Sequence, residues 1–259
     1  MDTILADLPF PTNELYTTYS PEQITTLETD FSWLVTPLYN ASQALLATPF
    51  FSWLDSLREP KAFRQAASQL YYHSTTFPKI IGIMLGLTRL DEQKLMPFYA
   101  SHAYGEADHS ELLLKWMLKY HLLDKATDIN KVIVTPETNA CINFGYRMAI
   151  AHDRDKWVVG MNCGIERCSQ QLFSYLAPKM RALGCGDYYF DIHQHADVHH
   201  SIMGLQYLPK IAPDSEHAKQ LVMLGLEAIS VWCAMLHSWM DERAVLPRFN
   251  INGELISPP

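Results

Sequence analysis

The chain has 259 residues, of which 48% are hydrophobic, and this is enough for one sizeable hydrophobic core. Its 20 Lys and Arg residues stand against 28 Asp and Glu residues, giving a formal net charge of −8, and no basic cluster occurs that would attract a phosphate backbone. We therefore expect a single domain over residues 1–259, with short tails near 1–15 and 248–259, and no nucleic-acid partner.

Cysteine usage and hydropathy predict a soluble, cytoplasmic protein. The five cysteines form no CxxC pair and are odd in number, which indicates reduced thiols rather than a disulfide framework. The amino terminus lacks the basic stretch ahead of an apolar block that is typical of a signal peptide. The strongest apolar run, residues 80–87, is far shorter than the roughly 18 residues needed to cross a bilayer. No membrane partner is expected.

Helix signals recur along the chain and alternating strand patterns are almost absent, so an all-α fold is expected. Ser20 to Gln23 (SPEQ) form a capping box, and Thr48 and Thr135 each precede a proline at an expected helix start. Glycines near 184–186 and the segment 208–215 interrupt the later helices. Helices are expected near 21–46, 49–58, 60–74, 77–87, 91–121, 136–152, 154–183, 187–207 and 214–242.

The segment 191–200 (DIHQHADVHH) holds four of the eleven histidines. A helix turns about 100° per residue, so His193, Asp197 and His200 fall on one line, whereas His195 and His199 point elsewhere. Imidazole nitrogen and carboxylate oxygen are ligands that iron, manganese and zinc accept. The alternative for each histidine alone is an ordinary surface residue or a core residue with one hydrogen bond.

Two other expected helices supply partners for these residues. Glu106 and His109 stand at i and i+3, the spacing by which helical bundles present a carboxylate and an imidazole to a di-iron centre. Glu166 lies among apolar and small residues, where an unpaired carboxylate is unfavourable. An ion pair remains the alternative for Glu166, and a solvated helix face the alternative for Glu106. The six candidates suit two metals sharing carboxylates, whereas a mononuclear iron would use half of them and a closed zinc site usually includes cysteine.

The ordered set Glu106-x-x-His109, Glu166 and His193-x3-Asp197-x2-His200 resembles the haem-oxygenase-like di-iron oxidases, also described as iron-containing redox enzymes and related in fold to thiaminase-like proteins. The segment 71–78 (YYHSTTFP) is also similar to the stretch ahead of the family's first ligand helix. The likeness covers roughly residues 60–210. Haem itself is disfavoured, because a haem oxygenase proper uses one axial histidine near the amino terminus and no histidine precedes His73 here.

The resemblance implies a bundle of about seven or more helices, frequently a homodimer, that binds two ferrous ions, with manganese as an alternative, and uses dioxygen. It implies catalytic roles for the carboxylates Glu106, Glu166 and Asp197. The expected substrate is a small carboxylate-bearing molecule, an amino acid or its derivative, undergoing N-oxygenation or oxidative C–C or C–N cleavage. A fatty-acid oxidative decarboxylase is the alternative within the family. Since no flavin or porphyrin motif occurs, electrons come from the substrate or an external reductant.

Several further residues are candidates for supporting roles. His102, one turn before Glu106, is expected to be a hydrogen-bond partner of that residue rather than a ligand. His73 either lines the cavity or closes the core, and the arginines either pair with a substrate carboxylate or form surface ion pairs. Two other classes of protein remain open: a metal-independent, thiaminase-like hydrolase, and a helical binding protein with a pH-sensitive face. The candidate arginines for a substrate carboxylate are Arg147, Arg167 and Arg181. The pH-sensitive face of a binding protein would contain His195 and His199.

Overall fold

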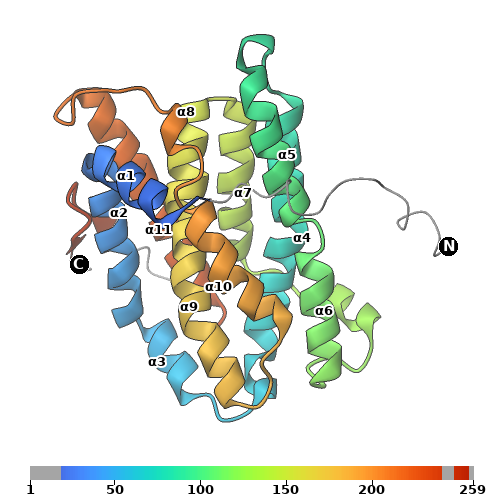
Figure 1. Cartoon of the computed structure of the whole chain (residues 1–259). Helices are drawn as coiled ribbons and strands as arrows, with labels where there is room; N and C mark the ends of the chain where they lie inside the picture. The colour runs from blue at the N-terminus through green and yellow to red at the C-terminus, as the bar shows by residue number, and fades with distance from the viewer. Residues whose placement is uncertain (1–18, 241–247, 257–259) are drawn as a thin grey trace.

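The computed structural model describes residues 19–240 and 248–256, which form a bundle of long helices with one small hairpin (Figure 1). This confirms the expected all-α fold. The hairpin corrects the expectation of a tail over residues 248–259, because β1 (Arg248–Phe249) pairs antiparallel with β2 (Leu255–Ile256) and the Phe249 side chain is buried. The expected tail over residues 1–15 lies outside the described residues.

The amino-terminal helices begin where the sequence signals place them. The capping box is formed, since Ser20 Oγ accepts from the Gln23 backbone N–H and Gln23 Oε1 accepts from the Ser20 N–H. The helix expected at 21–46 is divided at Phe31, and Thr48 precedes a helix without making the expected side-chain cap bond. The elements are α1 (Pro21–Asp30), α2 (Ser32–Ala44), the 3₁₀ turn η1 (Leu45–Ala47) and α3 (Pro49–Ser56).

A single long helix, α4 (Arg64–Gly86), follows the 3₁₀ turn η2 (Pro60–Phe63) and replaces the two helices expected at 60–74 and 77–87. Pro78 lies inside this helix, although proline removes one backbone hydrogen bond from a helix interior. The flanking side chains Phe77 and Ile81 are buried in the core, and this packing keeps the helix continuous.

The helix expected at 91–121 is broken, and the break falls between Glu106 and His109. The structure has the 3₁₀ turn η3 (Leu90–Leu95), α5 (Met96–Gly105) and α6 (His109–Lys119), with residues 106–108 in a turn. The cause is local, because the weak helix former Gly105 is the last residue of α5 and Glu106 follows as its cap. The 3₁₀ turn η4 (Ala126–Lys131) follows.

The helix expected at 154–183 is continuous, but its middle is wound as a π-helix. α8 (Arg154–Trp157) passes into η5 (Val158–Glu166), a nine-residue π segment, and then into α9 (Arg167–Ala182). Such segments are rare and frequently occur at functional sites. Before them, α7 (Pro136–Ala151) begins with the expected Thr135 cap, whose hydroxyl accepts from the Thr138 N–H.

The last long helices are α10 (Tyr188–His200) and α11 (Glu216–Ser238), separated by the 3₁₀ turn η6 (Leu205–Tyr207). The helix expected at 187–207 ends earlier, because Gly204 adopts φ +94°, which a right-handed helix cannot contain. By length and apolarity α11 is the one helix in the described chain that could cross a bilayer, but 67% of its most apolar window is buried in the protein. This burial is typical of a core helix.

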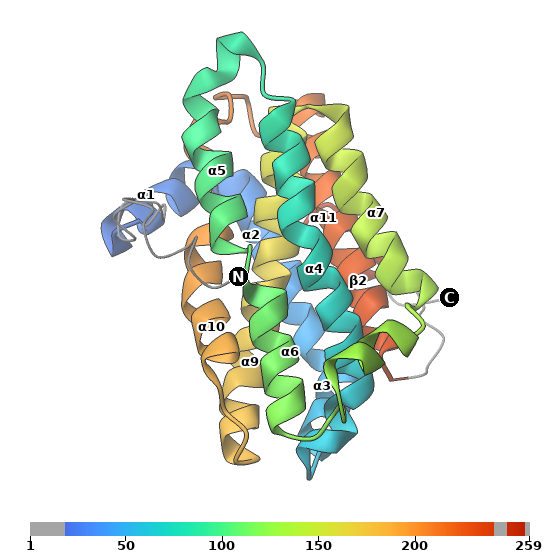
Figure 2. The same ribbon diagram turned by 90° about the vertical axis from the view of Figure 1, so that its right-hand side faces the viewer.

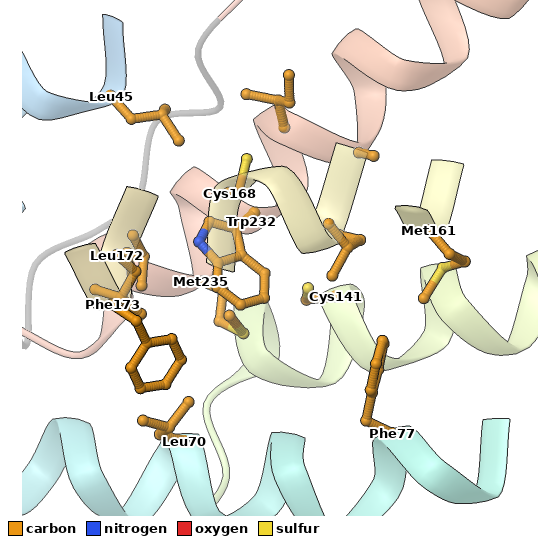
Figure 3. Close-up of a cluster of buried hydrophobic side chains, with 14 of the residues drawn as sticks. Leu45, Leu70, Phe77, Cys141, Met161, Cys168, Leu172, Phe173, Trp232 and Met235 are labelled. Atoms are coloured by element: carbon orange, nitrogen blue, oxygen red, sulfur yellow. The ribbon is translucent and has the colours of Figure 1, made fainter. Parts of the chain in front are cut away.

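The core lies where α4, α7, α9 and α11 face one another. Leu70 and Phe77 of α4 lie opposite Phe173 of α9 and Trp232 of α11 (Figure 3). All five cysteines are buried and free, as expected for reduced thiols. Outside this core, α5 and α6 follow one another along α4, while α10 packs on α9 (Figure 2). This side of the bundle therefore brings together the elements that carry the candidate ligands.

Candidate metal centre

Helix α10 separates its two faces as the helical period predicts. His193, Asp197 and His200 are buried, whereas His195 is exposed. His199 is half-buried on another side, where its Nδ1 accepts a hydrogen bond of 3.2 Å from a backbone N–H. The buried face contains the three residues that the sequence proposed as ligands.

The turn between α5 and α6 brings Glu106 and His109 together despite the break in the helix. His109 Nδ1 lies 2.7 Å from Glu106 Oε2, and both side chains are buried. The other carboxylate oxygen, Oε1, lies 3.4 Å from His200 Nδ1. Glu106 therefore faces imidazoles on two sides, in the position of a carboxylate shared between two neighbouring groups of ligands.

Glu166 is the last residue of the π segment and is only 3% exposed. No Lys or Arg lies within ion-pair distance of it in the described chain, so the ion pair considered from sequence has no basic partner of that kind. Its Oε1 lies 2.8 Å from His102 Nε2, and its Oε2 lies 3.8 Å from His200 Nδ1. Glu166 therefore points into the same cluster as Glu106.

The side chains form two adjoining groups that share Glu106. In each group one ligand atom from every member lies within 4.8 Å of those of all the others. Ligand bonds of about 2.1 Å place opposite ligand atoms about 4.2 Å apart, so each group could close on one ion with small shifts. The first group is Glu106, His109 and His193, and the second is His102, Glu106, Glu166 and His200.

Asp197 lies beside the second group without belonging to it. Its Oδ2 accepts a hydrogen bond of 2.7 Å from Ser169 Oγ, and its Oδ1 lies 3.8 Å from His200 Nδ1. The Oδ1 atom is buried and has no hydrogen-bond partner. The structure thus places five of the six predicted ligands in the two groups and the sixth next to them.

Burial and charge act in opposition on these groups. Burial raises the pKa of Glu106, but the neighbouring His109 and His200 outweigh it and hold that pKa below its ordinary value. Burial lowers the pKa of His200, whereas Glu166 and Glu106 raise it more, to about 9. Burial and the nearby Glu166 raise the pKa of Asp197 well above its usual range. The metal-free cluster therefore holds protons in the places where cations would be bound.

His193 is oriented for coordination through one defined nitrogen. Its Nδ1 lies 2.7 Å from the Tyr189 carbonyl oxygen, which can only accept, so Nδ1 carries the proton and Nε2 has a free lone pair. Its ring stacks on Phe173 at 4.1 Å, and burial lowers its pKa to about 3. His193 is therefore a neutral imidazole throughout the physiological range.

The donor set fits a metal centre. Among the described residues, three buried polar atoms of the six predicted ligands have no hydrogen-bond partner: His109 Nε2, His200 Nδ1 and Asp197 Oδ1. Such atoms are costly to bury unless something compensates them. Nitrogen and oxygen donors without thiolate suit iron or manganese, and divalent charges would neutralise the three carboxylates.

A small cavity adjoins the candidate ligands. The space open to the centre of a water molecule inside it is about 20 Å³, which is room for a molecule of that size and little more. Apolar side chains from α4, α9 and α11 form much of its wall, and none of its described lining residues is Lys or Arg. Its polar lining residues are His73, Ser74, Glu106, Glu166, Ser169 and His193.

The three arginines considered for substrate binding lie elsewhere. Arg147 pairs with Glu227 at 2.6 Å and Arg181 pairs with Asp191, all four side chains being about half exposed. These are the surface ion pairs considered from sequence. Arg167 is buried, with its Nη2 3.7 Å from a glutamate of α1, and it does not line the cavity.

Sequence reasoning overlooked several residues that support the cluster. Ser169 stands three residues after Glu166, so its place on the same helix face was a usable signal. Asn162 donates from Nδ2 to the His200 carbonyl oxygen at 3.1 Å, and Phe173 stacks on His193. No local motif marks these two roles, because both depend on how α10 packs against η5 and α9.

A family profile described as "Iron-containing redox enzyme" matches residues 64–230, which contain every candidate ligand. The chain belongs to the iron-containing redox enzyme family. No match was found among curated proteins. The proteins of this family are described as redox enzymes that contain iron, and the buried His and Glu cluster of this chain is compatible with metal binding.

Solved structures show that this redox-enzyme family member has the haem-oxygenase-like fold. A TenA homologue from Pseudomonas syringae pv. tomato has a TM-score of 0.66 and 14% sequence identity, covering 84% of this chain and 92% of its own. A domain of unknown function with a heme oxygenase-like fold, from Shewanella denitrificans, has a TM-score of 0.65 and 15% identity, covering 86% and 94%. Both the expected fold and its relation to thiaminase-like proteins are confirmed.

Proposed function

We propose that the protein is a non-haem di-iron oxidase or oxygenase that uses dioxygen to oxidise a small carboxylate-bearing substrate. The preferred substrate is an amino acid or its derivative, modified by N-oxygenation or by oxidative C–C or C–N cleavage. The observation that carries this proposal is the pair of adjoining ligand groups that share Glu106. Two such groups suit two ions joined by one carboxylate, which is the arrangement of di-iron helical bundles.

When bound, two ferrous ions would supply the electrons and the open positions at which dioxygen is reduced. Glu106, His109 and His193 would hold one ion, and Glu106, Glu166 and His200 the other. Asp197 lies close enough to join the second position if its Oδ1 moves toward His200. The protein side chains then set the geometry, and the small cavity beside them leaves room for little water.

The cavity must widen for any organic substrate, and a small substrate needs the least widening. Room for little more than a water molecule does not suit the long alkyl chain of a fatty acid, whereas a compact substrate needs only modest widening. No cationic side chain lines the cavity in the described chain, so a substrate carboxylate would find its positive partner at the metal positions. Membership of an iron-containing family supports iron rather than manganese, whereas the ligands themselves suit both.

The second candidate is a metal-independent, thiaminase-like hydrolase, which the likeness to a TenA homologue favours. Glu106 and Glu166 could serve such a reaction as carboxylates. A cysteine nucleophile has less support, because no cysteine lines the cavity and burial raises the pKa of both Cys141 and Cys163 to about 12. Turnover under strict exclusion of oxygen would favour this candidate.

The deciding experiment adds ferrous iron to metal-free protein anaerobically and then introduces oxygen. We expect two irons per chain and a transient visible absorption that changes with the correct substrate. The twenty amino acids and a series of fatty acids should be tried side by side. Persistent binding of one zinc, with no uptake of iron under reducing conditions, would overturn the di-iron proposal. A response to fatty acids alone would overturn the substrate preference.

A further inference from the structure

His102 occupies a position inside the cluster that the ordered ligand set does not include. It lies on α5, one helical turn before Glu106, and only 1% of its surface is exposed. Glu106 caps α5 four residues later, and its backbone N–H donates to the His102 carbonyl oxygen at 3.1 Å, so both side chains leave the same end of the helix. The His102 ring lies 4.4 Å from that of His200, measured between centroids, and 5.8 Å from that of Phe77.

We propose that His102 is a direct ligand of the second metal position, which then carries two imidazoles, His102 and His200, beside two glutamates. This inference rests on the proposed di-metal function. The ligand atoms of these four residues all lie within 4.8 Å of one another, close to the span that one ion's ligand sphere requires. His102 Nε2 is already 2.8 Å from Glu166 Oε1, so both atoms face the same point.

Asp197 is the residue that the ligand pattern would place here, and the geometry favours His102 over it. Ser169 Oγ holds Asp197 Oδ2 at 2.7 Å, whereas the contact of His102 Nε2 is with Glu166, which itself belongs to the second group. Asp197 Oδ1 lies 3.8 Å from His200 Nδ1. His102 already belongs to the second group, whereas Asp197 would join it only by moving.

A second imidazole changes the charge of the position and hence what it binds. Glu106 and Glu166 are then the only anionic ligands of the two divalent ions, and their two negative charges do not balance the charge of the ions. The Asp197 carboxyl, held by Ser169, is beside this charge rather than bound to it. An anionic substrate group can then bind at the metals, in agreement with a cavity whose described lining contains no Lys or Arg.

The competing role for His102 is that of an N–H donor to Glu166, and the variant His102→Gln separates the two roles. The glutamine amide can still donate to Glu166 but is a poor ligand compared with imidazole. Cobalt(II), added anaerobically, is the probe, because its visible spectrum and its paramagnetically shifted proton spectrum report the ligands directly. Exchangeable imidazole N–H signals count the coordinated histidines.

In the wild-type protein we expect two cobalt ions per chain and four shifted imidazole signals, from His102, His109, His193 and His200. His102→Gln should lose one signal, change the visible spectrum and bind the second ion at least about tenfold more weakly. The exposed His195→Gln variant is the matched control and should behave as wild type. Free imidazole should restore the second ion's spectrum in His102→Ala.

Two results would contradict the inference. Wild-type protein that binds two ions but shows three imidazole signals would leave His102 outside the ligand set, and this count needs no variant to fold. A His102→Gln protein with the wild-type spectrum and affinity would do the same. Wild-type protein that binds no cobalt or iron would instead contradict the proposed function, so the two failures are distinguishable.

Discussion

Asp197 lies between two imidazoles on the buried face of α10, and we expect its replacement by Ala to weaken binding of the second metal, because a carboxylate beside that position is lost. The variant loses a carboxylate whose unpartnered Oδ1 faces His200. Iron should fall from two ions per chain toward one, and oxygen uptake should fall with it. His195→Ala and His199→Ala should keep both, because these side chains lie away from the cluster. Equal losses in the Asp197 and His195 variants would contradict one metal-binding face, and circular dichroism checks that the helices survive.

Protons and metal compete for the same imidazoles, which gives a second prediction at this scale. In the metal-free protein Glu166 and Glu106 hold the pKa of His200 at about 9 and Glu106 raises that of His109. An incoming ion must displace these protons, so its affinity should rise from pH 6 to about pH 9 and level off above. Titration calorimetry in buffers of different ionisation enthalpy measures the protons released. An affinity independent of pH would show that the ions do not bind these histidines.

At the scale of the element, sequence periodicity was sufficient where an element is regular. It placed the buried face of α10 and the isolated carboxylate of Glu166. It failed where backbone geometry departs from a plain α-helix. The turn begins after Gly105, a weak helix former that the expected helix over 91–121 passed over, whereas the π winding before Glu166 packs against α11, which no local pattern records. The expected hydrogen bond of His102 to Glu106 is corrected for the same reason, since its Nε2 lies 2.8 Å from Glu166 Oε1 instead, and only the fold brings these two residues together.

The π segment is held by close packing, and Gly164 tests it. A Cβ at this position would lie 2.6 Å from the Ala228 Cβ of α11, closer than real carbon atoms approach. We expect Gly164→Ala to lower the free energy of unfolding by about 1–3 kcal/mol and to weaken metal binding at the neighbouring Glu166. The control is Gly82→Ala in α4, which meets nothing within 4 Å and should raise stability by about 0.5–1 kcal/mol. Urea unfolding compares the two, and equal effects would contradict the packing argument.

At the scale of the whole molecule, the described residues share one hydrophobic core, and the candidate ligands lie along one side of it. We therefore expect the bundle to fold through its apolar contacts before any metal ion is bound. A homodimer, a cytoplasmic location and an external reductant stay predictions. Sedimentation of the metal-free and iron-loaded protein tests the first of these.

Metal loading should stabilise the entire fold, because ions bound only by the native state shift the unfolding equilibrium. At a free ion concentration of 100 times Kd the gain is about 2.7 kcal/mol, which for a chain of this size raises Tm by roughly 5–10 °C. Calorimetry with and without ferrous iron under anaerobic conditions measures this shift.

Asp197→Asn is the variant to compare with the wild type. Burial and Glu166 raise the pKa of Asp197 and so favour its uncharged form in metal-free protein, which means that the amide should leave metal-free Tm nearly unchanged. With iron, the variant should show a smaller rise, because the second ion loses a nearby negative charge. A wild-type Tm that iron does not change would mean that the cluster is not a metal site of the native protein.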